Sequence, residues 1–129
     1  MTAAPEQAEV YEIDVPMIRD LPPLNANQRL HWRQKSQRVA LIRDAVTLLA
    51  RNAHIPTGRH LSVQLHFRPG DNRRRDASNL VPTQKPAVDG LVRAGIVPDD
   101  TADWVTEQMP KLHPGKGKRR LWLTVEVAS

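Results

Sequence analysis

The sequence predicts a single small domain of the α/β (α+β) class, with a mixed sheet of about four strands and two helices. Segments in which apolar and polar residues alternate, as in half-buried strands, are interleaved with segments whose apolar residues recur every three or four positions, as in helices. The chain has 129 residues, which is enough for one domain with a modest core. Residues 1–9 are polar and expected to form a loose tail, so the domain is assigned to residues 10–129.

The first strand and the first helix follow from periodicity. Residues 10–15 alternate, with Tyr11 and Ile13 on the apolar face, and predict a strand. A loop rich in Pro and Asn covers residues 21–27. Residues 33–53 then carry apolar side chains at helical spacing and predict a helix with a basic outer face. That basic face fits either a solvated surface or a contact with DNA.

The second half of the chain predicts one more helix and three more strands. Residues 61–67 alternate and predict a strand that ends in a loop. Residues 86–93 predict a short helix with Pro86 in its first turn and a glycine just beyond its end. Residues 104–111 and 121–127 predict two strands, joined by the flexible basic hairpin loop HPGKGKRR.

Charge and composition narrow the class of partner. The net charge of +5 and the pI near 10.2 favour an anionic partner, most often nucleic acid, with a membrane surface as the alternative. No apolar run approaches the ~20 residues that span a bilayer, and the N-terminal sequence has no signal-peptide pattern. The absence of cysteine excludes disulfides and thiolate zinc sites. These features fit a cytoplasmic protein.

Residues 72–103 place carboxylates inside a basic surface. Asp76 directly follows three arginines, and Asp99, Asp100 and Asp103 lie farther along. Carboxylates repel phosphates, so they suit a DNA-binding surface only if a divalent cation sits between them and the DNA. Mg²⁺ prefers oxygen ligands and keeps several waters, and it can activate water and stabilise charge on a phosphate. This pattern favours a metal-dependent nuclease.

Each of these residues also has a purely structural interpretation. Asp99 and Asp100 follow a proline and suit a turn, and Asp76 could form a surface ion pair with an arginine. A helix that packs back on the strand could instead bring the acidic groups together. Lys85 could orient an attacking water or stabilise negative charge, or it could be solvated. Asp89, on the same predicted helix, could support the site.

The histidines and the aromatic residues give weaker signals. The five histidines show no paired metal-binding spacing, so none is assigned as a ligand. His31 and Trp32, beside Arg29, could contact a sugar or a base. The alternative is that this aromatic pair packs on the edge of the domain.

Four motifs in order, PPLNANQRLHW, RRRDASNL, DGLVRAG and IVPDD, resemble the RusA family of Holliday junction resolvases, small endodeoxyribonucleases of phages and prophages. The resemblance covers roughly residues 10–127, and the combination is specific although each piece alone is weak. It implies a homodimeric α/β fold with a mixed sheet. It also implies Mg²⁺-dependent cleavage, with Mn²⁺ as a possible substitute, at symmetric positions across a four-way DNA junction during recombination and repair.

The resemblance also implies roles for individual residues. Asp76 and Asp100 match metal-binding catalytic aspartates, Asp99 is the acidic neighbour of Asp100, and Lys85 matches the catalytic lysine. Ser78 stands where the family has its second aspartate, so metal affinity should fall unless another carboxylate compensates. The candidates for that support are Asp89, Asp99 and Asp103. A longer gap before Asp89, containing Pro82 and Pro86, separates this chain from the family's pattern.

The remaining expectations concern DNA. If Ser78 has cost the chain its metal site, the alternative function is a catalytically weak or inactive architectural protein that binds junctions. In either case a set of basic side chains is expected to hold phosphates without reading the base sequence. These are Arg29, Arg73, Arg74, Arg75, Lys116, Lys118, Arg119 and Arg120.

Overall fold

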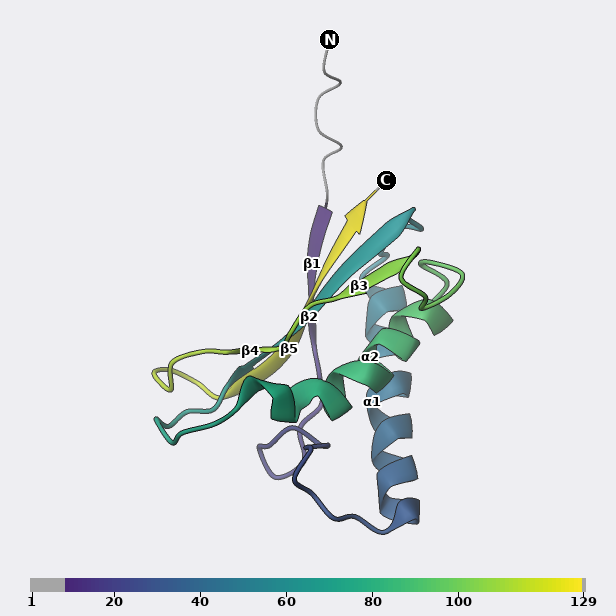
Figure 1. Cartoon of the computed structure of the whole chain (residues 1–129). Helices are drawn as coiled ribbons and strands as arrows, with labels where there is room; N and C mark the ends of the chain where they lie inside the picture. Colours follow the sequence, from purple (N-terminus) through teal and green to yellow (C-terminus); the bar gives the residue numbers. More distant parts are fainter. Residues whose placement is uncertain (1–8, 129) are drawn as a thin grey trace.

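The computed structural model describes residues 9–128 as a five-stranded mixed sheet with two helices on one face (Figure 1). Strands β1 (Glu9–Asp14), β5 (Arg120–Ala128) and β2 (His60–Arg68) lie in that order, and each neighbouring pair is antiparallel. Two short strands, β3 (Val105–Glu107) and β4 (Lys111–Leu112), pair in parallel with the other edge of β2. The predicted small domain with a mixed sheet and two helices is confirmed.

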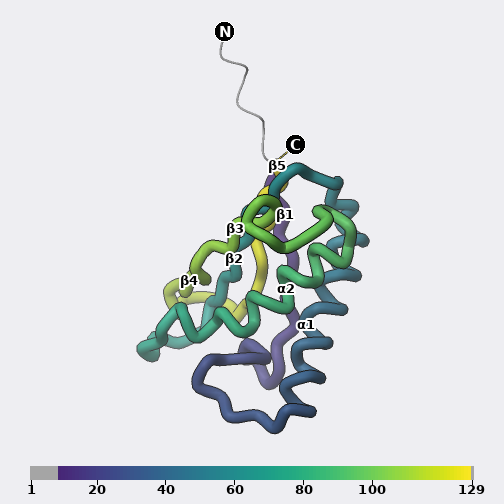
Figure 2. Tube along the Cα trace, turned by 45° about the vertical axis from the view of Figure 1, so that its right-hand side comes forward, coloured from purple at the N-terminus to yellow at the C-terminus, as the bar shows by residue number. Residues whose placement is uncertain are grey.

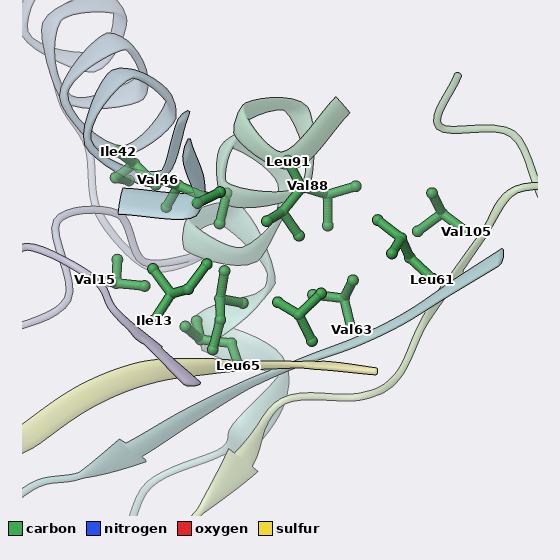
Figure 3. Close-up of a cluster of buried hydrophobic side chains, with 14 of the residues drawn as sticks. Ile13, Val15, Ile42, Val46, Leu61, Val63, Leu65, Val88, Leu91 and Val105 are labelled. Carbon is green, nitrogen blue, oxygen red and sulfur yellow. The ribbon is translucent and has the colours of Figure 1, made fainter. Parts of the chain in front are cut away.

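The helices α1 (Trp32–Asn52) and α2 (Val81–Arg93) pack against each other and against the sheet (Figures 1 and 2). Their buried stripes meet the apolar face of the strands, and the side chains point toward one another between the two layers (Figure 3). Ile42 and Leu91, for example, are fully buried. No helix within residues 9–128 is long and apolar enough to cross a membrane.

Alternation along the strands decides which face is buried. Leu61, Val63 and Leu65 of β2 are fully buried under the helices, and so are Leu123 and Val125 of the neighbouring strand β5. The strands predicted at 10–15, 61–67 and 121–127 and the helix predicted at 33–53 are confirmed within two residues. The predicted loose tail lies outside the described residues, except for Glu9, which is the first residue of β1.

The predicted start of the second helix is wrong. A short 3-10 helix, η1 (Ala77–Leu80), leads into α2 at Val81, and Pro86 lies inside α2 rather than in its first turn. Pro82 lies in that first turn instead. The backbone N–H groups of a first turn have no partner within the helix, so the missing N–H of a proline there costs no helical hydrogen bond. The buried side chains of Thr83 and Gln84 also bond to other segments, and these tertiary contacts hold the early turns.

The predicted hairpin near the C-terminus is also wrong. Residues 104–111 form two short strands rather than one, which raises the number of strands to five. Strands β4 and β5 do not pair with each other, because each is bonded to a different edge of β2. The connection at residues 113–119 therefore passes across the end of β2.

A cluster of rings lies on the sheet face opposite the helices. The Nδ1 atom of His66 lies 2.8 Å from Nε2 of His113, and its Nε2 atom lies 2.9 Å from the hydroxyl of Thr124. The ring of Trp122 stacks on His66, with centroids 5.1 Å apart. The guanidinium of Arg120 lies 4.6 Å from the Trp122 centroid, and only 5% of Trp122 is exposed.

Gly90 marks the closest approach of the two helices. A methyl group added there would lie 2.6 Å from the carbonyl oxygen of Arg43 and 3.0 Å from Cβ of Val46. Gly90→Ala should therefore lower the free energy of unfolding by about 1–3 kcal/mol, as overpacking does. Urea denaturation would measure it. The exposed neighbour Asp89→Ala should change stability by less than about 0.5 kcal/mol, and equal effects of both variants would contradict the close packing.

The ring cluster should make stability depend on pH. Burial, followed by nearby positive charge, lowers the pKa of His66 and of His113 below its ordinary value. Between the folded and unfolded pKa values the unfolded chain binds more protons, so the free energy of unfolding should fall as the pH drops through about 6.5.

Denaturation at about pH 7.5 and about pH 5.5 would measure this effect. The matched variant His113→Gln removes one titrating ring and should reduce the difference between the two conditions. A wild-type stability that rises on acidification through this range would contradict the assignment.

Candidate nucleic-acid and metal site

Asp76 follows the end of β2 and caps η1. Its carboxylate accepts a hydrogen bond from the backbone N–H of Ser78 at 3.1 Å. Hydrogen bonds from the Ser78 backbone and side chain hold the pKa of Asp76 below its ordinary value. Asp76 is exposed and therefore negatively charged at neutral pH. The side chain at position 78, where the resemblance leads one to expect an aspartate, thus lies directly against Asp76.

A small pocket opens beside Asp76. Its volume is about 140 Å³, and segments far apart in sequence form its walls. The loop before α1 contributes one wall, which includes Asn25 and Gln28, and the segment after β2 contributes Asp76 and Asn79. A backbone hydrogen bond of 3.2 Å from Ala26 to the carbonyl of Asn79 joins the two segments. Figure 2 shows the loop and the start of α2 at the same end of the molecule.

Buried hydrogen bonds hold the loop in place. The Thr83 hydroxyl donates to the Leu24 carbonyl at 2.6 Å and accepts from the Leu24 N–H at 3.1 Å. The guanidinium of Arg38, on α1, donates to the Pro23 carbonyl at 2.9 Å. The loop is therefore tied to both helices, and the pocket wall is fixed before any ligand binds.

Two further hollows adjoin this pocket. An open groove beside β4 shares Asp76 and Asn79 with it. A third hollow, beside the start of α1, shares Asn25 and Gln28 with it. The three depressions thus adjoin one another through shared lining residues, and Asp76 lines two of them.

The second acidic group lies elsewhere. Asp99 and Asp100 are exposed in the turn that leads into β3, and the Asp100 N–H donates to the Asp99 carboxylate at 2.7 Å. The carbonyl of Asp103, in the same turn, lies 3.1 Å from His60 Nδ1 at the start of β2. These contacts suit the turn interpretation of Asp99 and Asp100.

The expectation that the helix brings Asp76 together with Asp99 and Asp100 is wrong within one chain. Strands β2 and β3 are parallel, so α2 must carry the chain back from the end of β2 to the beginning of β3 (Figure 1). The thirteen residues of α2 span about 20 Å, at about 1.5 Å per residue. Asp76 and the Asp99–Asp100 pair therefore lie at opposite ends of this helix.

Within residues 9–128 no three acidic or histidine side chains gather in a way that could hold a metal ion. Neither Asp89 nor Asp103 joins Asp76 in such a group. The side-chain oxygen donors that line this pocket in one chain are the Asp76 carboxylate and the amides of Asn25, Gln28 and Asn79. The amide oxygens of Asn25 and Gln28 also accept hydrogen bonds from backbone N–H groups, at 2.7 and 3.1 Å. Mg²⁺ often binds through one or two carboxylates, several waters and substrate phosphates, so this donor set fits a weak magnesium site.

Lys85 has a partner that the sequence did not reveal. Its ammonium forms an ion pair of 3.3 Å with Glu107 on β3, and its side chain is 66% exposed. Glu107 could have been recognised only from the parallel pairing of β2 with β3, which depends on the tertiary fold. The structure therefore pairs Lys85 with β3, and no contact joins it to Asp76.

Two of the predicted DNA-contacting arginines have internal partners. Arg75 binds both carboxylate oxygens of Asp71, at 2.6 and 3.1 Å, and this interaction holds the pKa of Asp71 far below its ordinary value. Arg120 bonds to Asp14 at 3.0 Å and to Glu12 at 3.2 Å. Both arginines therefore contribute to the fold.

The other predicted cations include five exposed side chains that form no ion pair within residues 9–128, namely Arg29, Arg73, Arg74, Lys116 and Lys118. Arg119 is half-buried and donates to the Pro69 carbonyl at 2.7 Å. The loops that carry Arg73, Arg74, Lys116, Lys118 and Arg119 lie at the end of the sheet where β2 ends, and Arg29 lies in the loop before α1 (Figure 1). Sequence analysis missed Lys111, which lines the groove beside Asp76.

Comparison of the chain with protein-family models and with curated proteins gave no match.

The hydroxyl of Thr83 should control how firmly the pocket wall is held. Thr83→Val leaves the buried N–H and C=O of Leu24 without this partner, so it should lower the free energy of unfolding by about 1–3 kcal/mol. It should also speed amide hydrogen exchange in residues 21–28. Thr83→Ser keeps the hydroxyl and serves as the matched control. Equal protection of this loop in both variants would show that another contact fixes it.

Proposed function

We propose that this protein is a divalent-metal-dependent endodeoxyribonuclease that acts on branched DNA, with the four-way junction as its substrate. The observation that carries the proposal is the position of Asp76. This exposed, negatively charged carboxylate lies in a run of hollows at the end of the molecule that gathers the exposed cations. A phosphate and this carboxylate can share the groove only if a cation lies between them.

Electrostatics supports a nucleic-acid partner. Arg73, Arg74, Lys116 and Lys118 are exposed and form no ion pair within the described residues, so they can replace counterions along a phosphate backbone. Such contacts position the DNA and carry no sequence information. A preference for branched DNA then depends on the shape of the surface rather than on base recognition.

The residues around Asp76 have separable tasks in this proposal. Asp76, with the amide oxygens of Asn25 and Asn79, would hold Mg²⁺ or Mn²⁺. When bound, such an ion polarises a phosphate and lowers the pKa of a coordinated water. Ser78 orients the Asp76 carboxylate through its hydrogen bonds. Arg74 and Lys111 line the same groove and offset negative charge on the phosphate.

A homodimer is part of the same proposal. Two nicks placed symmetrically across a four-way junction need two active sites related by a two-fold axis. Because Asp99 and Asp100 lie at the opposite end of α2 from Asp76 in one chain, and this helix is about 20 Å long, they could supply further carboxylates only from a second copy. We assign this activity to the cytoplasm of a bacterial or phage-infected host cell.

A second candidate function is an architectural protein that binds junctions without cutting them. The observation that favours it is the single carboxylate of the site, with Ser78 beside it in place of a second aspartate. The two candidates differ in their response to metal. For the architectural protein, Mg²⁺ should act only by screening charge.

Asp76→Asn should abolish cleavage of a four-way junction, with a loss of at least about a hundredfold, because the site loses its charged ligand. Junction binding should be unchanged or tighter, since one repulsive charge is removed. An end-labelled synthetic junction in Mg²⁺, Mn²⁺ or EDTA, with linear duplex as the control, would measure both properties. Cleavage by this variant at the wild-type rate would exclude the assigned role.

Two further variants serve as controls for that result. Asp44→Asn changes an exposed carboxylate on α1, outside the hollows that Asp76 lines, and should cut normally. Asp100→Asn tests the second copy. Loss of cleavage with normal folding would indicate that the site is shared between two chains, and full activity would show that Asp100 is not needed.

A further inference from the structure

Trp32 is the most exposed large apolar side chain in the described part of the chain. It lies in the first turn of α1, and 67% of its surface is accessible. The aromatic pair formed with His31 therefore does not pack on the edge of the domain, which was one of two interpretations of the sequence. An indole ring in water is costly, and tryptophan is enriched where proteins bind partners.

The surroundings of Trp32 are cationic. The guanidinium of Arg33 lies 5.3 Å from the ring centroid, and the His31 ring lies 5.6 Å away at a tilt of 32°. Arg29, Arg33 and Lys35 are all exposed and form no ion pair within residues 9–128. The first turn of α1 contains no acidic residue. An aromatic face among unpaired cations is suited to a ligand that carries both a planar ring and negative charge.

Trp32 lies between Arg29 and Lys35 in the chain, and these two residues line the hollow beside the start of α1. The hollow lined by Arg29 and Lys35 shares Asn25 and Gln28 with the Asp76 pocket, and Trp32 is three residues beyond Arg29. The loop before α1 is tied to both helices. Its Pro23 carbonyl accepts from Arg38 on α1, and its Leu24 carbonyl accepts from Thr83 on α2. A strand whose phosphate lies at Asp76 and that follows these hollows would therefore reach the segment that carries Trp32.

We propose that Trp32 is a stacking platform for a base with a free face in the bound DNA, in the segment whose Arg29 and Lys35 line the hollow next to the Asp76 pocket. A base within a duplex has both faces covered by its neighbours, whereas a base at a branch point or in a single strand has a free face. Arg29, Arg33 and Lys35 hold the adjoining phosphates. The site thus recognises nucleotides whose bases have a free face. This inference rests on the proposed DNA-binding function but does not depend on cleavage.

Binding in EDTA tests this inference separately from catalysis. Trp32→Ala should weaken binding to a single-stranded oligonucleotide and to a four-way junction by about tenfold, the cost of one lost stacking contact. Its affinity for fully paired linear duplex should change by less than twofold. Trp32→Phe should recover most of the binding. Because the side chain is largely exposed, the variants should fold normally, and urea denaturation checks this.

A spectroscopic measurement adds an independent readout. The oligonucleotide should quench the fluorescence of the wild-type protein, and Trp32→Ala should lose that change although Trp104 and Trp122 remain. Leu48→Ala, at a position 60% exposed on the same helix, is the matched control and should bind like the wild type.

The outcomes separate this inference from the proposed nuclease activity. Equal single-strand affinity in the wild type and in Trp32→Ala, or an equal loss for duplex and single strand, would overturn the stacking platform. Selective loss in a protein that does not cut junctions would support the platform and reject the nuclease. A wild-type protein that binds none of these DNAs would overturn both.

Discussion

The arrangement of the molecule depends on strand β2, which is bonded along both of its edges. It pairs with β5 on one side and with β3 and β4 on the other. Because β3 is parallel to β2, the intervening helix α2 must run in the opposite direction. This single constraint puts Asp76 at one end of the sheet and the Asp99–Asp100 pair at the other. It also leaves the cationic loops that precede η1 and β5 at the Asp76 end.

Two buried polar side chains hold together the segments that surround the candidate site. Thr83 and Gln84 lie in the first turns of α2, and both are almost fully buried. Thr83 satisfies the backbone of Leu24, while Gln84 accepts from the Leu65 N–H and donates to the Gln108 carbonyl. The start of α2 is thereby joined to the loop before α1, to the central strand and to the chain after β3. A polar group without a partner in this position would be costly, so these bonds also specify the register of the helix.

Helices and strands could be predicted from the sequence wherever the spacing of apolar residues matched the burial of those residues in the fold. The alternation in β2 and β5 and the helical spacing in α1 identified those elements closely, and Asp76 was recognised as an acidic residue among cations. The start of α2, the partner of Lys85 and the distance from Asp76 to Asp100 were not predictable in this way. Each depends on which strands become neighbours, and periodicity along the chain carries no information about that. Pro86 predicted a helix that starts near residue 86, but the buried contacts of Thr83 stabilise an earlier start.

The position of β5 between β1 and β2 has a consequence for how the chain folds. Residues 9–14 are bonded to residues 122–127, so the pairing that completes this side of the sheet closes a loop of more than a hundred residues. Contacts so distant in sequence slow folding, because chain entropy is lost before they form. During synthesis, β1 must wait without its partner until almost all of the described chain has been made. Early exposure of this strand is therefore a hazard that a chaperone, or a fast collapse of α1 and α2, would have to limit.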